Sequence, residues 1–139
     1  PFLDAERAAT ISPNLRFTDD LLDLCASCDY ITIHVPATPK TKGMIGADEI
    51  AAMKEGAAFL NFSRDTLVDN DAMRAGLTSG KVRRYVTDFA TPEVMAMEGA
   101  LVLPHLGAST AEAEENCAEM AVREVMDYLE TGKKVHCVN

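Results

Sequence analysis

Short apolar runs alternate with stretches of helical spacing from residue 30 onward. Four of these runs have the length of strands, and they cover residues 30–35, 57–62, 84–89 and 100–103. They are rich in β-branched residues and nearly unbroken in apolarity, whereas a sheet with one face in water shows strict alternation. The pattern predicts an α/β fold in which helices cover both faces of a parallel sheet.

Helix starts are marked by side chains whose oxygen can accept hydrogen bonds from the first backbone amides. Three such residues precede helical patterns: Thr18, Asp48 and Asp69. Because glycine adopts the left-handed conformation readily, Gly56 and Gly80 mark the expected ends of the second and third of these helices.

The last helix has the strongest signals. A capping box over residues 109–112 begins it and Gly132 ends it, which gives a long C-terminal helix of about twenty residues. Its apolar positions keep helical spacing, so we expect them to pack into the core: Cys117, Met120, Ala121, Val125, Tyr128 and Leu129. No repeat or linker divides the sequence, which predicts a single unit.

Composition narrows the classes of function. Of 139 residues, 47% are apolar and 25% are charged, as in ordinary globular domains. The net charge of −9, from 13 basic and 22 acidic residues, disfavours nucleic acids and anionic membranes as partners. No apolar run approaches the ~20 residues of a membrane span, so we expect a cytoplasmic protein. Because the chain begins at Pro1 without an initiator Met, we also expect more of the protein to precede it.

Cys25 and Cys28 have the spacing of zinc-ribbon and thioredoxin-like sites. No second close pair of Cys or His residues completes a metal site, and Cys25 lies in an apolar helical stripe. We therefore interpret it as a small packing residue and expect no metal.

Candidate chemistry lies where the strands end, because ligands of parallel sheets bind at the carboxyl ends of strands. Arg64, Glu93 and His105 each follow a different predicted strand. Alone, each has an ordinary explanation, such as a surface ion pair or a solvated loop residue. Together they suit acid–base chemistry on an anionic substrate, because guanidinium binds carboxylate, imidazole moves a proton, and a carboxylate orients the imidazole.

Three short sequence motifs follow one another along the chain. Residues 28–46 contain a strand that ends in His-x-Pro, residues 53–69 carry Asn-Phe-Ser-Arg, and residues 104–110 read Pro-His-Leu-Gly-Ala-Ser-Thr. With Asp88 and Glu93 between the last two, they resemble the D-2-hydroxyacid dehydrogenase family over about residues 29–139. The resemblance implies a partial Rossmann-type sheet, with residues 1–139 forming a truncated NAD-binding domain.

The same resemblance implies NAD as cofactor and hydride transfer at C2 of a small anionic 2-hydroxy or 2-keto acid. Arg64 is expected to bind the substrate carboxylate, His105 to exchange the hydroxyl proton, Glu93 to orient His105, and Asp88 to face the nicotinamide. Further cofactor contacts are implied, besides those of Arg64 and His105, for Val35, Pro36, Phe62, Ser63 and Gly107.

Two departures from the family pattern bear on activity. Asp65 stands where the family usually has Gly, and its carboxylate is expected to pair with Arg64 and compete with substrate. No Gly-x-Gly-x-x-Gly loop occurs, although that loop and its helix hold the cofactor pyrophosphate in this fold. We therefore expect the isolated chain to bind dinucleotide weakly and to be inactive.

Three interpretations remain open. The Gly-Ala-Ser-Thr form over residues 107–110 resembles the phosphoglycerate dehydrogenases of the family, which act in serine biosynthesis. A glyoxylate or hydroxypyruvate reductase is the enzymatic alternative, and a dinucleotide-sensing interaction protein of the same fold is the other. Because a partial sheet exposes an edge that invites pairing, a homo-oligomer is expected.

Overall fold

The computed structural model describes residues 10, 12 and 14–136. The chain divides into two compact units, one reaching to Pro104 and the other starting at His105, where the sequence predicts a single unit. Each unit is described by itself below.

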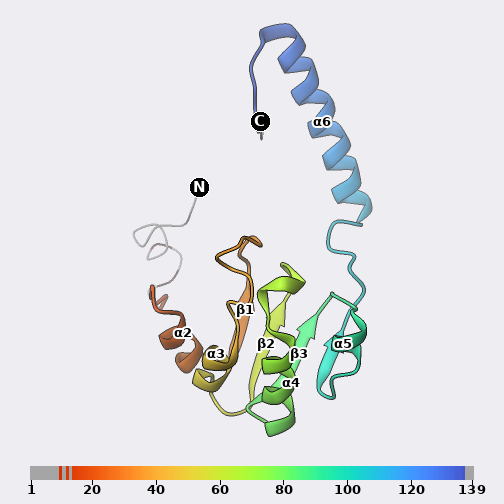
Figure 1. Ribbon diagram of the computed structural model, residues 1–139. Helices are drawn as coiled ribbons and strands as arrows, with labels where there is room; N and C mark the ends of the chain where they lie inside the picture. The colour runs from red at the N-terminus through yellow and green to blue at the C-terminus, as the bar shows by residue number, and fades with distance from the viewer. Residues whose placement is uncertain (1–9, 11, 13, 137–139) are drawn as a thin grey trace. The chain divides into compact units, whose positions relative to one another are not determined.

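The first unit is built on a four-stranded parallel sheet (Figure 1). Its strands are β1 (Tyr30–Ile33), β2 (Ala57–Asn61), β3 (Val82–Thr87) and β4 (Ala100–Val102), and they lie side by side in that order. The predicted α/β class and parallel arrangement are confirmed. All four strands end earlier than predicted, and β3 also begins two residues earlier, so the residues after each strand form loops at the carboxyl edge.

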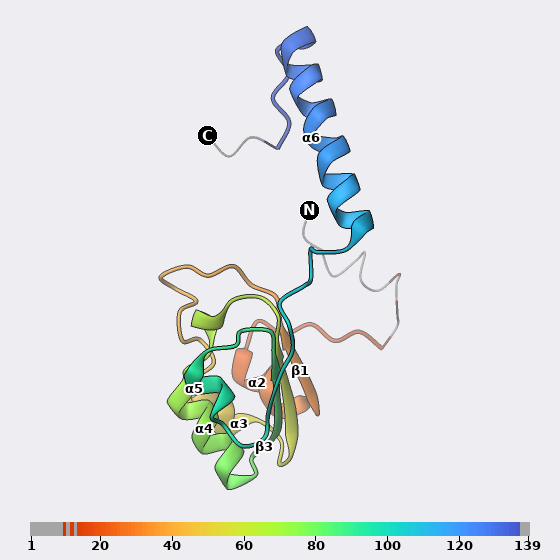
Figure 2. The ribbon, with the colours of Figure 1, turned by 90° about the vertical axis from the view of Figure 1, so that its right-hand side faces the viewer.

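Helices α3 (Ala47–Ala52), α4 (Asn70–Ser79) and α5 (Pro92–Met95) connect successive strands. Because the strands follow one another in spatial order and such connections are right-handed, all three helices fall on one face of the sheet. Figure 2 shows them on the same side. Helix α2 (Leu21–Ser27) precedes β1 and packs beside α3.

The prediction that helices cover both faces is wrong for the described residues of this unit. Side chains alternate across a strand, and the row Ile31, Phe59, Tyr85 is buried beneath the helices. In the adjacent row Thr32 is exposed and Leu101 is 52% exposed, while Tyr30 is 69% exposed. The central strand β2 and the short edge strand β4 carry apolar residues on both faces, which gave these runs their unbroken appearance.

Helices α2 and α3 begin at other residues than predicted, because other side chains accept the hydrogen bonds at their amino ends. Asp20, not Thr18, precedes α2, and its Oδ1 accepts hydrogen bonds from the amides of Leu22 and Asp23. Gly46, not Asp48, precedes α3, with the Glu49 carboxylate accepting from the Gly46 amide at 3.0 Å.

The predicted bounds of α4 are confirmed, whereas the predicted end of α3 is wrong. Asp69 begins α4 and Gly80 ends it in the left-handed conformation, both as predicted. Gly56 has φ of 71° but lies in the turn before β2, because α3 already ends at Ala52.

The second unit contains α6 (Ala111–Thr131), the long C-terminal helix that the sequence predicts. Thr110, not Ser109, caps it by accepting from the Ala113 amide, and Gly132 ends it with φ of 70°. No residue of α6 is buried, so the expectation that its apolar positions form core is wrong within this unit.

Cys25 lies fully buried in the core of the first unit, as its apolar context predicts. Burial raises the pKa of its thiol, and Glu49 and Cys28 add to the shift. Within residues 10, 12 and 14–136, no group of three or more His, Cys, Asp or Glu is arranged to hold a metal ion. Across the same residues, no helix is both long and apolar enough to cross a membrane.

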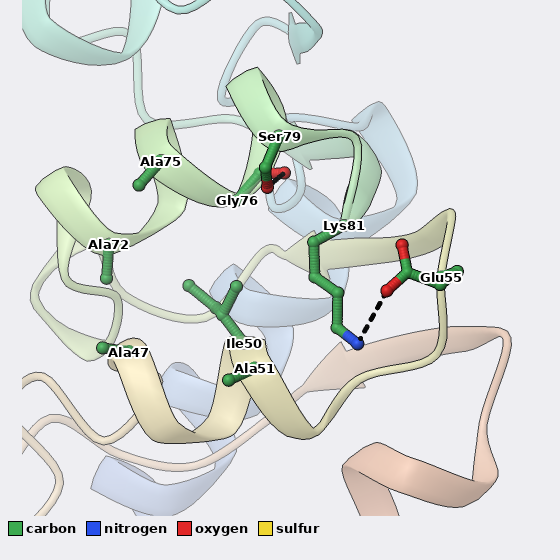
Figure 3. A pocket seen from close by; sticks show the side chains of 9 residues that line it. All are labelled: Ala47, Ile50, Ala51, Glu55, Ala72, Ala75, Gly76, Ser79 and Lys81. Carbon is green, nitrogen blue, oxygen red and sulfur yellow. Dashed lines mark hydrogen bonds and ion pairs between the residues drawn. The ribbon is translucent and has the colours of Figure 1, made fainter.

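The crossing of α3 and α4 requires glycine at position 76. A Cβ atom there would lie 2.7 Å from Ile50 Cγ2 and 3.3 Å from Val82 Cγ2. Gly76 and Ile50 line a groove between the two helices, with the Lys81–Glu55 ion pair at its end (Figure 3). We predict that Gly76→Ala destabilises the fold by about 1–3 kcal/mol, although alanine is the better helix former, because overpacking exceeds the gain in propensity.

Urea denaturation measures this effect. Thr78→Ala, an exposed position of the same helix, is the control and should change stability by less than about 0.5 kcal/mol. A Gly76→Ala variant more stable than the control would contradict the close approach of the helices.

Candidate functional site

The turn that carries Arg64 is held by a buried side chain at the end of β2. Asn61 is fully buried, and its Nδ2 donates to the Arg64 carbonyl at 2.8 Å while its Oδ1 accepts from the Ser63 amide at 3.1 Å. The side-chain amide of Asn61 therefore fixes the backbone of the turn at both Ser63 and Arg64. The Arg64 side chain is exposed beyond it and donates to the Ser63 carbonyl.

A second buried hydroxyl supports Asn61 from the neighbouring strand. Thr87, also fully buried, donates to the Asn61 carbonyl at 2.9 Å and accepts from the Phe89 amide at 3.3 Å. The Tyr85 hydroxyl lies beside both side chains, and burial raises its pKa although hydrogen bonds to Asn61 and Thr87 lower it. This polar network ties the ends of β2 and β3 together under the candidate site.

Sequence reasoning missed both Asn61 and Thr87. The signal was present, because each is a polar residue in an otherwise apolar strand. Buried polar groups are hydrogen-bonded in folded proteins, so such residues need defined partners. Their partners are backbone groups, which the sequence does not reveal.

Asn61→Asp tests the clamp on the Arg64 turn. The substitution keeps the acceptor for the Ser63 amide but replaces the donor to the Arg64 carbonyl by a carboxylate oxygen. We predict a loss of stability of about 1–3 kcal/mol, the cost of leaving a buried group unsatisfied. Equilibrium unfolding in urea measures it, with Asn14→Asp at an exposed position as matched control. Equal midpoints for the two variants would argue against the clamp.

Residues expected to contact cofactor gather where β1 and β2 end. The Ser63 hydroxyl donates to the Val35 carbonyl at 2.7 Å and joins the two loops. Val35 is half-buried, Pro36 is exposed and Phe62 is 39% exposed. An apolar surface with few fixed polar groups suits a flat ring such as nicotinamide, so these residues fit that end of the cofactor. Nothing in the sequence offers the glycine-rich loop for the pyrophosphate.

A cavity of about 440 Å³ lies at the carboxyl ends of β2 and β3, and we call it the edge cavity. Asp65, Arg74 and Glu93 are among the residues that line it. Glu93 is exposed in the first turn of α5, where hydrogen bonds to its own backbone and to Thr91 lower the pKa of its carboxyl, and Arg74 adds to the effect. Glu93 is therefore held as a carboxylate, the form that can orient a charged imidazole.

The expected pairing of Asp65 with Arg64 is wrong for the described structure. Asp65 Oδ1 accepts from the Thr66 amide at 2.8 Å, in the first turn of a short 3-10 helix, η1 (Asp65–Leu67). No ion pair between Asp65 and Arg64 occurs among the residues described. The Arg64 guanidinium consequently keeps most of its donors for an anionic ligand.

His105 and Gly107 belong to the second unit, whereas Arg64, Glu93 and Asp88 belong to the first. Asp88 is half-buried directly after β3, at the carboxyl edge. The structure thus gathers the first-unit residues at one edge of the sheet. The pairing of His105 with Glu93 stays a prediction.

Known proteins resemble this chain in sequence and in fold. Residues 4–107 match the family described as D-isomer specific 2-hydroxyacid dehydrogenase, NAD binding domain. The D-3-phosphoglycerate dehydrogenase of Methanocaldococcus jannaschii is 33% identical over 135 residues, which cover 93% of this chain and 25% of that protein. The enzyme of that name from Mycobacterium tuberculosis is 39% identical over 121 residues, covering 83% and 22%.

Among solved structures, a glyoxylate reductase from Paecilomyes thermophila is similar with a TM-score of 0.75 and 26% identity, over 83% of this chain and 37% of that one. The Rossmann-type fold and the predicted family are confirmed, and the family description includes NAD as cofactor. The chain spans about a quarter of the length of the two curated relatives. It belongs to the NAD-binding domain family of the D-isomer specific 2-hydroxyacid dehydrogenases.

Proposed function

We propose that the chain is the C-terminal part of the NAD-binding domain of a dehydrogenase that oxidises D-3-phosphoglycerate to 3-phosphohydroxypyruvate, a step of serine biosynthesis. The observation that carries the proposal is the placement of Arg64 and Glu93 at the same carboxyl edge of a parallel sheet, where Asn61 fixes the Arg64 backbone and Glu93 lines the edge cavity. The two curated relatives named above, both D-3-phosphoglycerate dehydrogenases, support the choice of substrate.

In this proposal each catalytic residue has one task. Arg64 binds the substrate carboxylate through two parallel hydrogen bonds, a geometry that the planar guanidinium provides and lysine does not. His105 accepts the proton of the C2 hydroxyl during oxidation, and Glu93 orients its ring and stabilises the imidazolium. NAD, when bound, supplies the acceptor for the hydride that leaves C2.

Cofactor contacts are assigned in the same way. Val35, Pro36, Phe62 and Ser63 contact the nicotinamide half, Asp88 faces its carboxamide, and Gly107 lies close to the ring together with Arg64 and His105. The pyrophosphate is held outside residues 1–139, because no glycine-rich loop occurs in them. We therefore propose that this chain is a truncated domain, which binds NADH weakly in a fluorescence titration and is inactive alone.

The working protein is proposed to be a cytoplasmic homo-oligomer. Strands β1 and β4 form the edges of the described sheet, and unpaired edges favour association with another chain unless they are covered. The net charge of −9 disfavours nucleic acid and anionic membranes as partners.

One assay of the complete protein separates the proposal from its alternatives. NADH formation is followed by absorbance with NAD and D-3-phosphoglycerate, and in parallel with D-glycerate. We expect faster turnover of the phosphorylated acid. Faster oxidation of NADH with glyoxylate or hydroxypyruvate would instead indicate a reductase, an alternative favoured by the similar glyoxylate reductase structure. Binding of NADH without turnover of any of these acids would indicate a dinucleotide-sensing interaction protein.

A further inference from the structure

Two polar side chains lie next to each other in the core of the first unit. Asn61 and Thr87 are fully buried, and they are register partners at the carboxyl ends of β2 and β3. The other buried residues among those described are hydrophobic. A buried polar network whose groups are hydrogen-bonded rigidifies its surroundings and specifies one geometry. The pair therefore indicates that the backbone around it is held in a defined position.

The Thr87 hydroxyl makes hydrogen bonds toward two turns that carry proposed site residues. Its Oγ1 donates to the Asn61 carbonyl at 2.9 Å, and the Asn61 side chain in turn donates to the Arg64 carbonyl at 2.8 Å. The same Oγ1 accepts from the Phe89 amide at 3.3 Å, which closes a turn over residues 87–89. We call this the Asp88 turn. A single hydroxyl thus stands between the Arg64 turn and the Asp88 turn.

The main chain of Thr87 is held independently of its hydroxyl. Strand pairing joins it to Asn61 on one side and to Val102 on the other, and its carbonyl accepts from the Leu103 amide at 2.8 Å. Valine has nearly the same shape as threonine but offers neither donor nor acceptor. Valine at position 87 therefore removes the two hydrogen bonds of the hydroxyl and leaves the backbone pairing of β3 available.

The two turns have to keep a fixed separation if they hold two reactants. In the proposed function Arg64 binds the substrate carboxylate, and Asp88 faces the nicotinamide carboxamide. The Arg64 side chain is exposed, so the backbone of its turn decides where the guanidinium reaches. Productive transfer needs the reacting atoms about 3–3.5 Å apart, and a misplacement of about 1 Å costs up to about 10²-fold in rate.

We propose that Thr87 is a positioning residue, whose hydroxyl holds the Arg64 turn and the Asp88 turn at the separation that hydride transfer requires. The inference rests on the proposed function for the tasks of Arg64 and Asp88. Because its side chain is fully buried, Thr87 acts through its neighbours and not by contact with substrate. Its effect passes through Asn61 to Arg64, and through the Phe89 amide to the Asp88 turn.

Thr87→Val in the complete enzyme tests the assignment, with NAD and D-3-phosphoglycerate as substrates. We expect kcat/KM for the acid to fall roughly 10- to 100-fold. Thr87→Ser restores the hydroxyl but removes a buried methyl group, and it should recover most of this loss. Thr78→Val, at an exposed threonine of α4, is the matched control and should leave kcat/KM unchanged. Equal losses in the valine and serine variants would show that the hydroxyl has no special role.

A double-mutant cycle separates positioning from a loss of folded enzyme. In an Arg64→Ala background, Thr87→Val should lower kcat/KM by a factor at least about threefold smaller than in the wild type, since part of its effect passes through Arg64. A merely structural defect reduces the amount of active enzyme by the same factor in both backgrounds. That result would overturn the proposal.

Binding of NADH to the complete protein, followed by fluorescence, keeps the inference distinct from the proposed function. We expect Thr87→Val to raise the Kd for NADH roughly 3- to 10-fold, the factor given by one hydrogen bond, and Thr87→Ser to restore it. A wild-type protein that binds NADH without oxidising any 2-hydroxy acid would overturn the proposed function, and the Kd ratio would then decide on Thr87. An unchanged Kd in the valine variant would refute the positioning role in either case.

Discussion

Replacing His105 by alanine in the complete enzyme is expected to lower kcat by about 10²–10⁴-fold, the contribution of a positioned general acid–base group. The loss follows because His105 is the group proposed to take the hydroxyl proton as hydride leaves C2. KM for NAD should change little, since the imidazole contributes to the chemical step more than to cofactor binding. Steady-state kinetics with NAD varied at a saturating concentration of the hydroxy acid measure both parameters.

His136→Ala is the matched control for the His105 variant. His136 is an exposed histidine of the same unit, with Nδ1 2.8 Å from Glu124 Oε1. Its removal should leave kcat unchanged. A His105→Ala enzyme that retains wild-type kcat would remove His105 from the catalytic set.

Arg64→Ala is expected to lower kcat/KM for the hydroxy acid by roughly 10²–10⁴-fold. The estimate takes two charge-assisted hydrogen bonds to the substrate carboxylate at about 1.5–3 kcal/mol each. Arg64→Lys should recover only part of the loss, because an ammonium group cannot make the bidentate contact. The assay varies the acid at fixed NAD.

Arg16→Ala controls for the loss of one exposed arginine, since Arg16 precedes α2 and pairs with Asp23. It should retain wild-type kcat/KM. Full recovery of activity by Arg64→Lys would show that charge alone suffices and would contradict bidentate binding.

The sequence predicted the fold where apolar periodicity is strong. Four parallel strands and the helix after Thr110 were found, because strand-length runs and cap residues are local signals. Which faces of the sheet are covered by helices is not determined by a local signal in the sequence. The apolarity of β2 on both faces suggested two covering layers, whereas the sequential strand order places the connecting helices on one face. Coverage depends on topology, which apolar runs alone do not specify.

In the candidate site, too, the sequence revealed residues with local signals and did not reveal those that depend on contacts made in the fold. Arg64 and Glu93 were predicted because they follow strands and match ordered motifs, and the structure places both at the carboxyl edge of the sheet. Asn61 and Thr87 were missed, since their partners are backbone carbonyls and amides that only the folded chain brings near. Proximity in sequence also misled: Asp65 stands next to Arg64, but its carboxylate accepts a hydrogen bond from the Thr66 amide within the short 3-10 helix.

The most direct test of the proposed function follows the hydrogen atom at C2 of the substrate. The complete enzyme is incubated with NAD and D-3-phosphoglycerate carrying deuterium at C2, and the reduced cofactor is analysed by mass spectrometry. We predict that each NADH formed carries one deuterium on its nicotinamide ring, and that the L-acid yields none. Reduced cofactor without deuterium, or no reduced cofactor at all, would contradict hydride transfer from C2 at the site that Arg64, Glu93 and His105 are proposed to form.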